Sequence, residues 1–461
     1  MGTWCVGISQ IVVDHLNFAA MRETNFISNP SLLLSTGFAV ALVLGLLLKF
    51  WLSSRQIRHV ALHRGQVPAA FAQTITLAAH QKAADYTVAK ARLGLLETAL
   101  GAAVLVGWTL LGGLSLLNET LKAWLGAGML QQLALLAGFA IISGLIDLPL
   151  SLYQTFVLEE RFGFNKITLK LWLLDAVKGS LMGALIGLPI AALILWMMGA
   201  SGGLWWLWAW CVWMGFNLLL LVIYPTIIAP MFNKFTPLQD EAVKARVTAL
   251  MQRCGFAAKG LFVMDGSKRS AHANAYFTGF GAAKRVVFFD TLLSKLSPAE
   301  VDAVLAHELG HFKHKHVIKR IVSMFAMSLV GFALLGWLAT QTWFYTGLGV
   351  MPNVAAPNDA LALLLFLLVM PVFSFFISPI FAQLSRKHEF EADAYAMQQT
   401  SGQDLATALL KLYEDNATTL TPDPVYVSFY YSHPGASERL ARMLPGGLAG
   451  SAPSPQPLSP T

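Results

Sequence analysis

The chain has 461 residues, of which 56% are hydrophobic and only 12% are charged. A soluble domain carries about a quarter charged residues, so this composition excludes an ordinary soluble domain and favours a polytopic membrane protein. The formal net charge of +7 does not indicate nucleic-acid binding, because the basic residues flank apolar runs, where they would contact the anionic headgroups of membrane lipids.

Seven apolar segments follow one another along the chain, each long enough to cross the roughly 30 Å hydrocarbon core of a bilayer. The residues before the first segment are mixed and polar, so we expect no cleavable signal peptide and a first segment that stays as a membrane anchor. One long polar stretch separates the fifth segment from the sixth. The spans are expected near 31–52, 94–117, 126–150, 172–199, 203–228, 321–345 and 360–384.

The short loops differ in positive charge, which predicts the orientation in the membrane. Nine basic residues lie in the first and third loops, and two lie in the N-terminal segment and the second loop. The N-terminus is therefore expected outside, and the long polar stretch and the C-terminal part in the cytoplasm. The nine are Arg55, Arg58, Arg64, Lys82, Lys90, Arg92, Arg161, Lys166 and Lys170, and the two are Arg22 and Lys122.

Several polar side chains fall inside the expected spans, where a buried charge is costly. They could pair with one another, as Asp175 with Lys178 one helical turn away, or they could face a water-filled chamber inside the helix bundle. The sequence leaves both interpretations open. The residues concerned are Glu97, Asp147, Asp175, Lys178 and Asn217.

The motif with the clearest chemistry is His307-Glu308-Leu309-Gly310-His311. Ser297 and Glu300 predict the start of a helix through a capping box. Residues four apart share a face of that helix, so His307 and His311 can bind one metal ion. Glu308 would take a proton from metal-activated water and deliver it to a leaving amine, which is the chemistry of zinc peptidases that carry this HExxH pattern.

A catalytic zinc ion needs a third protein ligand and one open position. Glu389 is the best candidate, on a helix that emerges from the seventh span, and Asp393 on the same face would orient a zinc-bound histidine. His388 is the competing ligand, although it points about 100° away from Glu389 on a helix. Glu391 is expected to point to solvent.

His314 and His316 follow the motif closely, and a structural role on the membrane-interface face is the favoured interpretation for both. His311 lies shortly before the sixth span and Glu389 shortly after the seventh. The metal centre is therefore expected at the membrane surface, which favours a membrane-tethered or lipid-bearing substrate.

These elements divide the chain into five expected parts. Residues 1–228 would form an N-terminal membrane region with five spans, and 229–320 a cytoplasmic domain with the HExxH helix. Spans six and seven would occupy 321–384. Residues 385–444 would add a helical part to the cytoplasmic domain, and 445–461, rich in Gly, Pro and Ser, would be disordered.

Beyond this motif, the sequence resembles the type I CAAX prenyl endopeptidases, which are integral-membrane zinc proteases of the gluzincin type. The resemblance covers residues 150–440 in detail. It implies a mainly α-helical fold in which seven long helices enclose a large chamber, capped by a small α+β zincin-like catalytic domain. The segments that carry it are 159–166, 224–235, 265–270, 274–279, 307–311, 389–393 and 431–434.

By position, the resemblance implies one zinc ion held by His307, His311 and Glu389, with Glu308 as the general base. His433 would stabilise the oxyanion and Arg439 would help to hold the substrate. Residues Asn274, Ala275 and Tyr276 would form an edge strand that pairs with the substrate backbone, as strand addition to an open sheet edge allows.

The resemblance leaves the substrate open between prenylated CAAX proteins and other membrane-associated or misfolded proteins. The Ala-, Leu- and Gly-rich spans favour a bacterial inner membrane, and a eukaryotic source would imply the endoplasmic reticulum. One alternative function is a membrane quality-control protease of the same clan, for which fewer spans, usually four, are expected. A transporter or channel is a second alternative, but it does not account for the metal motif beside the spans.

Overall fold

The computed structural model describes residues 29–256, 260–278 and 285–444. The chain is mainly α-helical, and seven helices in the described part are long and apolar enough to cross a membrane, as the sequence predicts. Seven candidate spans argue against the alternative of a quality-control protease, for which four spans are expected. The seven helical segments are Pro30–Leu62, Leu77–Trp108, Met129–Glu159, Leu169–Ala200, Gly202–Phe232, His316–Leu338 and Asp359–Gln399.

Within these segments the α-helices are interrupted only by short π-helical or 3-10 turns. Helix α5 passes into a π-helical turn, and α7 passes through a second π-helical turn that contains Pro225, a residue that cannot donate a helical hydrogen bond. The elements are α2 (Pro30–Leu62), α3 (Leu77–Trp108), α5 (Met129–Tyr153), α6 (Leu169–Ala200), α7 (Trp205–Ile223), α8 (Ala229–Phe232), α12 (His316–Leu338), α14 (Asp359–Ser374) and α15 (Ser378–Gln399).

The spanning helices are longer than the apolar runs in the sequence. A helix of 32 residues is about 48 Å long, well beyond the roughly 30 Å of the hydrocarbon core. Most of the predicted first loop is therefore helical: α2 continues to Leu62, and α3 begins at Leu77, where the N–H of Ala79 donates to Oγ1 of Thr76 at 3.1 Å. Each of these helices therefore extends beyond the apolar run that predicts it.

The second and sixth spans end earlier than predicted. At Gly112 the backbone turns with a φ of +78°, and the predicted 94–117 span is divided into α3 and a separate helix α4 (Gly113–Leu125). The expected 321–345 span similarly ends at Leu338 and is followed by the short helix α13 (Thr342–Thr346). Apolar composition alone does not reveal these turns.

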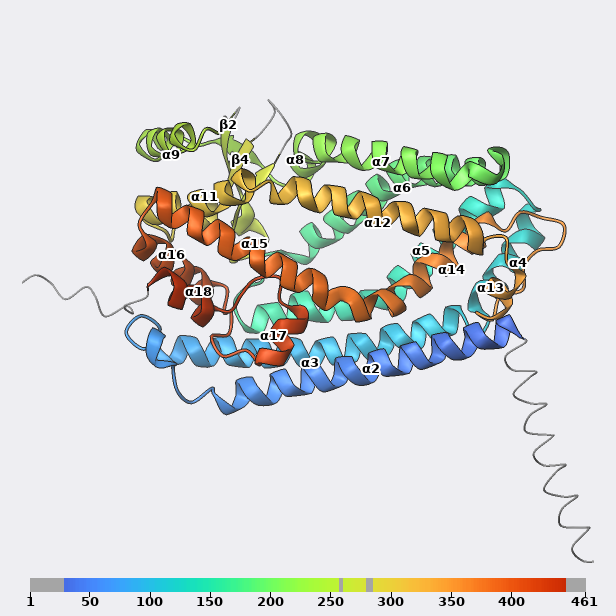
Figure 1. Cartoon of the computed structure of the whole chain (residues 1–461), viewed down its shortest axis with the longest axis horizontal. Helices are drawn as coiled ribbons and strands as arrows, with labels where there is room; N and C mark the ends of the chain where they lie inside the picture. Colours follow the sequence, from blue (N-terminus) through green and yellow to red (C-terminus); the bar gives the residue numbers. More distant parts are fainter. Residues whose placement is uncertain (1–28, 257–259, 279–284, 445–461) are drawn as a thin grey trace, which may run out of the picture.

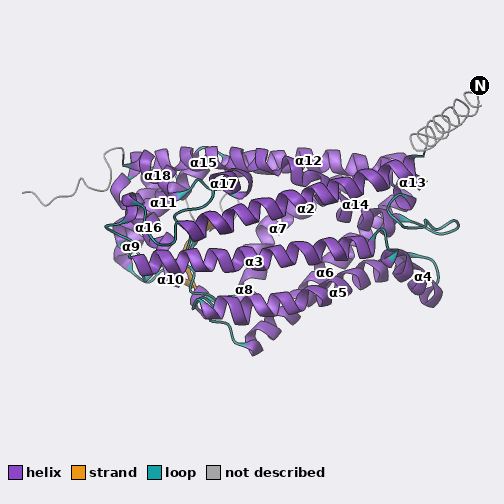
Figure 2. Cartoon of the chain, turned by 90° about the horizontal axis from the view of Figure 1, so that it is seen from below, coloured by secondary structure: helices purple, strands orange, loops and turns teal. Residues whose placement is uncertain are grey.

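The spanning helices run along the long axis of the molecule (Figure 1). Helices α4 and α13 lie at one end, and α9 (Glu241–Arg253), α11 (Pro298–Lys313), α16 (Gly402–Asp415) and α18 (Ala436–Met443) lie at the other. Figure 2 shows α2, α3 and α5 side by side along this axis. Several leucines of α2 and α6 are more than half exposed, among them Leu47 at 60% and Leu185 at 69%, as expected of helices that contact lipid tails.

A cavity of about 830 Å³ lies inside the helix bundle, lined by α2, α3 and α14. Glu97 of α3 is among its lining residues, so one of the intramembrane polar groups faces an internal chamber. The cavity reaches Tyr431 near the soluble end of the molecule. The structure thus contains the chamber that the resemblance implies.

Another intramembrane charge is paired, although not with the expected partner. Asp175 of α6 accepts two hydrogen bonds from Arg269, at 2.9 and 3.2 Å, and Lys178 donates to the carbonyl of Met231 at 3.2 Å. The predicted pair between Asp175 and Lys178 is wrong, because each side chain reaches across to the chain that enters or forms the soluble domain. These contacts attach span four to that domain.

The soluble domain is built around a four-stranded sheet with the order β1-β2-β4-β3. Strands β2 and β4 are parallel, and the two outer pairs are antiparallel. Val286 and Phe288 of β4 pack with Leu305 and Leu309 of α11 in one buried core, which confirms the small α+β domain. Its remaining elements are β1 (Phe235–Pro237), β2 (Gly260–Met264), β3 (Ala275–Thr278), β4 (Arg285–Phe289), α10 (Asp290–Leu293) and α17 (Pro424–Tyr430). The tail 445–461, expected to be disordered, lies outside the described residues.

Candidate metal centre

Helix α11 begins with the capping box that the sequence predicts. The N–H of Ser297 donates to Oε2 of Glu300 at 2.7 Å, and the N–H of Glu300 donates to the Oγ of Ser297 at 3.4 Å. The buried Glu300 carboxylate also accepts from Lys411 of α16 at 2.8 Å. The start of α11 is therefore fixed both locally and to the neighbouring helix.

Helix α11 crosses α15 at very short distance, and Gly310 makes this possible. A Cβ atom added to Gly310 would lie 2.9 Å from the Cα and 3.0 Å from the carbonyl oxygen of Ala392. Because backbone atoms cannot move aside as a flexible side chain can, only glycine fits at this position without separating the helices. The small residues at the crossing bring the histidines of α11 and the acids of α15 together.

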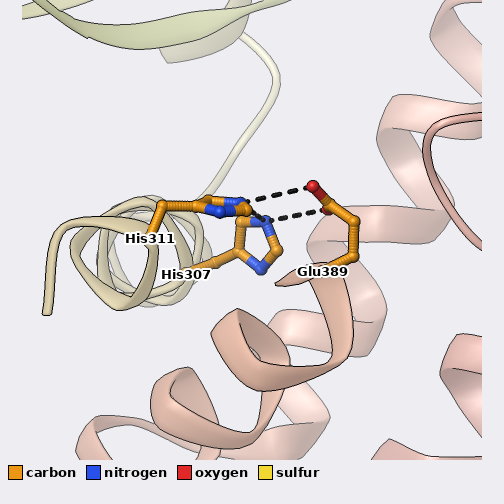
Figure 3. A group of neighbouring side chains, drawn as sticks. All are labelled: His307, His311 and Glu389. Carbon is orange, nitrogen blue, oxygen red and sulfur yellow. Dashed lines mark hydrogen bonds and ion pairs between the residues drawn. The ribbon is translucent and has the colours of Figure 1, made fainter. Parts of the chain in front are cut away.

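Three side chains converge at this crossing (Figure 3). The Nε2 atoms of His307 and His311 lie 3.2 Å apart, and each lies 3.4 Å from an oxygen of Glu389. His307 and Glu389 are buried and His311 is half-buried. The structure thus brings together the three residues that the sequence suggests as metal ligands.

These donor atoms fit a zinc ion. Two imidazole nitrogens and one carboxylate form a ligand set that zinc uses at catalytic sites, where the fourth position stays open. The buried Oε2 of Glu389 forms no hydrogen bond within the described part of the chain. Lone pairs that face one another in a buried space repel, and a cation between them removes that repulsion.

Asp393 lies behind His307, as the four-residue spacing from Glu389 predicts. Its Oδ1 lies 2.8 Å from Nδ1 of His307, and both carboxylate oxygens accept from the buried Arg439, at 2.9 and 2.6 Å. Burial by itself would lower the pKa of His307, but its contacts with Asp393 and Glu389 outweigh burial and raise that pKa to about 9. The two carboxylates therefore demand positive charge at His307, which a proton or a metal ion can supply.

Glu308 lies beside the ligands on α11 and is half-buried. Burial raises the pKa of its carboxyl, and the nearby negative charge of Glu389 adds to that effect, while His307 and Arg439 oppose it. A carboxylate whose pKa is raised is a better proton acceptor than an exposed one, and its protonated form is still accessible. These are the properties of a group that first accepts and later returns a proton.

His433 reaches the centre from the loop between α17 and α18. Its Nε2 lies 3.4 Å from Oε1 of Glu389, and its Nδ1 lies 2.9 Å from the Oγ of Ser432. Partial desolvation by the surrounding residues lowers the pKa of His433, although 61% of its side chain is exposed, and the lowered pKa favours the neutral ring at pH 7. If the hydroxyl of Ser432 donates to Nδ1, the proton of the neutral ring is on Nε2, directed toward the site.

Strand β3 lies at the edge of the sheet, and Asn274 immediately precedes it. The carbonyl of Asn274 accepts from the N–H of Phe289 at 3.0 Å. Because hydrogen bonding alternates along an antiparallel pair, the main-chain groups of Ala275 are directed away from β4, and those of Tyr276 toward it. The edge is therefore built as strand addition requires, although the N–H of Ala275 is bonded to the side chain of Asn274 at 2.8 Å.

Aromatic rings connect this edge to the metal centre. The ring of Phe256 lies 5.1 Å from that of Phe277 in β3 and 4.8 Å from that of Phe312, the residue after His311. The strand and the end of α11 are thus separated by a single ring.

The sequence does not predict the contacts of three residues, Glu391, His316 and His388. Glu391, expected in solvent, accepts from Nε2 of His316 at 2.8 Å, and Nδ1 of His316 lies 3.0 Å from Nδ1 of His311. His388, the competing ligand, stacks on the ring of His316 with centroids 4.0 Å apart and does not join the three converging side chains. Helical periodicity could not find these contacts, because His316 lies five residues from His311 and beyond the end of α11.

Comparisons with known proteins identify the family of the chain. Residues 56–234 match the family described as CAAX prenyl protease N-terminal, five membrane helices, and residues 237–444 match peptidase family M48. CAAX prenyl protease 1 of Saccharomyces cerevisiae is 37% identical over 345 residues, which cover 71% of this chain and 76% of that protein. The Homo sapiens homolog is 33% identical over 347 residues, covering 67% and 73%. The crystal structure of S. mikatae Ste24p matches with a TM-score of 0.83 at 31% identity and covers 89% of this chain and 99% of that one.

The crossing at Gly310 generates a prediction. Replacement Gly310→Ala should destabilise the protein by about 1–3 kcal/mol, because the new methyl group overlaps the backbone of Ala392. It should also weaken metal binding by separating the ligand helices. Thermal unfolding in detergent and metal content by elemental analysis measure the two effects.

Gly331→Ala on α12 is the matched control, because its Cβ would meet only the Phe366 ring at 3.9 Å. If Gly310→Ala unfolds at the same temperature as Gly331→Ala and retains the same metal content, the close crossing is not required.

Proposed function

The chain belongs to the M48 peptidase family together with the CAAX prenyl proteases, and we propose that it uses zinc to cleave prenylated CAAX-type proteins at the cytoplasmic face of its membrane. It is an integral membrane metalloendopeptidase, as both family matches and the seven spans establish. The observation that carries the proposal is the convergence of His307, His311 and Glu389 beside Glu308, on helices joined to spans six and seven.

In the proposed mechanism, His307, His311 and Glu389 would hold a zinc ion. When bound, zinc supplies Lewis acidity that makes water a nucleophile near neutral pH. The carboxylate of Glu308 is placed to accept a proton from the water molecule whose oxygen attacks the scissile carbonyl. The same carboxyl then delivers the proton to the nitrogen of the leaving amine, so that it returns to its starting state.

His433 is proposed to donate a hydrogen bond to the oxygen of the scissile carbonyl as negative charge develops there. Its position near Glu389 and its contact with Ser432 support this role. Arg439 is buried and bonded to Asp393, and it therefore holds the acid that orients His307. A direct contact between Arg439 and the substrate stays a prediction.

The substrate backbone is proposed to pair with residues 274–276 as an added strand. Main-chain pairing positions a peptide without selecting its side chains, so specificity must come from elsewhere. The names of the relatives point to a prenylated CAAX terminus, and a site at the ends of two spans suits a substrate that is itself anchored in lipid. Cleavage of other membrane-associated proteins would use the same chemistry.

The cytoplasmic placement of the site is supported by the excess of basic residues at that end of the first spans. For the membrane itself, the span composition favours a bacterial inner membrane, and the endoplasmic reticulum is the corresponding place in a eukaryote. The relatives reported above are eukaryotic proteins.

The two acids of the site should have separable roles. Glu308→Gln should retain the metal and lose about a hundredfold to ten-thousandfold in kcat/KM, because an amide cannot accept the proton. Glu389→Ala should lose metal as well as activity. Elemental analysis and a peptide-cleavage assay distinguish them. Turnover by Glu308→Gln at the wild-type rate would contradict the base assignment, and full metal content in Glu389→Ala would point to another ligand.

The substrate class is tested with a farnesylated CAAX peptide and its unprenylated counterpart. The farnesylated peptide should have the higher kcat/KM, because each buried CH₂ group contributes about 0.8 kcal/mol to association with an apolar environment. Cleavage products are quantified by mass spectrometry with purified protein in lipid nanodiscs. Equal kcat/KM for the two peptides would eliminate a lipid requirement while leaving the peptidase assignment intact.

The orientation is tested by cysteine labelling in a background without Cys5, Cys211 and Cys254. A membrane-impermeant maleimide added to spheroplasts should label Ala127→Cys, in the exposed loop between α4 and α5. It should label Gln239→Cys, exposed before α9, only after the membrane is permeabilised. The reverse pattern would place the catalytic domain outside.

A further inference from the structure

His316 occupies an unusual position next to the metal centre. It is 4% exposed, and both of its ring nitrogens have partners. Nδ1 lies 3.0 Å from Nδ1 of His311, and Nε2 lies 2.8 Å from Oε2 of Glu391. The side chains therefore form a continuous line from a proposed zinc ligand to a carboxylate that is partly open to solvent.

The backbone around His316 is shaped to place it there. Helix α11 ends at Lys313 and α12 begins at His316, with Lys315 between them at a φ of +57°. This left-handed conformation is unfavourable for a non-glycine residue. The sharp turn brings His316 back against His311 instead of continuing the helix away from it.

Only one placement of the ring protons of His311 and His316 satisfies both contacts of His316. Zinc binding at Nε2 of His311 requires a lone pair there, so the ring proton of His311 is on Nδ1. That N–H can donate only if Nδ1 of His316 is an acceptor, which places the proton of His316 on Nε2. Nε2–H then donates to the carboxylate of Glu391. Each contact selects the tautomer that the next one needs.

We propose that His316 and Glu391 are positioning residues that fix the tautomer and ring orientation of His311 for zinc binding. This inference rests on the zinc centre proposed above and assigns it two further residues. The role is parallel to that of Asp393, which contacts Nδ1 of His307 directly. One helix, α15, thus supports the centre in three ways: Glu389 as a ligand, Asp393 through His307, and Glu391 through His316.

A second cation site is the competing interpretation, because ligand atoms of His316, His388 and Glu391 also lie within 4.8 Å of one another. Three observations oppose it. Both nitrogens of His316 already have hydrogen-bond partners, and His388 lies flat against His316 in a stack instead of turning a nitrogen toward a shared point. Lys319, Arg320 and Lys387 also place positive charge around His388, which repels a cation.

The test measures zinc affinity by competition with a chelator, in full-length protein that carries Glu308→Gln so that the readout is independent of turnover. His316→Phe keeps the ring and removes both nitrogens, and it should weaken zinc binding about 10- to 100-fold. Glu391→Leu should weaken it similarly. Glu391→Gln keeps an oxygen that can accept from Nε2–H, and its loss should be only a few-fold.

His388→Phe is the matched control. It preserves the stack on His316 and removes nitrogens that take no part in the contacts between His311, His316 and Glu391. It should bind zinc as tightly as the parent. Unchanged zinc affinity in Glu391→Leu and in folded His316→Phe would overturn the proposal that these residues position His311. A second bound zinc equivalent that His388→Phe abolishes would overturn it in favour of the second site. A parent that binds no zinc would instead refute the proposed function on which the inference rests.

Discussion

The whole site depends on two helices that touch without side chains between them. Gly310 of α11 lies against the backbone of Ala392, and this contact determines how far the histidines stand from Glu389. Three neighbouring contacts reinforce that crossing. The capping box fixes the start of α11, Lys411 ties it to α16, and Asp393 holds His307 from the opposite helix. Because backbone atoms, unlike side chains, cannot change rotamer, this contact fixes the relative positions of the candidate metal ligands.

The same crossing creates an electrostatic problem that the surrounding residues only partly solve. Glu389 and Asp393 place two carboxylates in a buried space, and Arg439 neutralises one of them through two hydrogen bonds. Buried charge without a partner is costly, so the remaining negative charge must be matched by a cation or a proton. Affinity for a metal is thus a property of the charge balance in the domain as well as of the three ligands.

Much of this site could be predicted from the sequence because its geometry repeats every turn of a helix. His307 with His311, and Glu389 with Asp393, are each four residues apart, so secondary structure alone aligns them. The contacts that could not be predicted depend on where chains meet. Arg269 pairs with Asp175 across 94 positions, and His316 contacts His311 only because Lys315 adopts a positive φ. The spans were found from hydropathy, but their ends were not, because helices continue into water where composition becomes polar.

The order of the ligands along the chain has a consequence for how the protein is made. His307, Glu308 and His311 precede span six, and Glu389 lies in α15, the last helix of the seventh helical segment. During synthesis the ribosome must complete both spans, and the membrane must accept them, before Glu389 can meet its partners. A nascent or truncated chain therefore carries the reactive motif without the means to use it. The three side chains can therefore come together only after the membrane domain is complete.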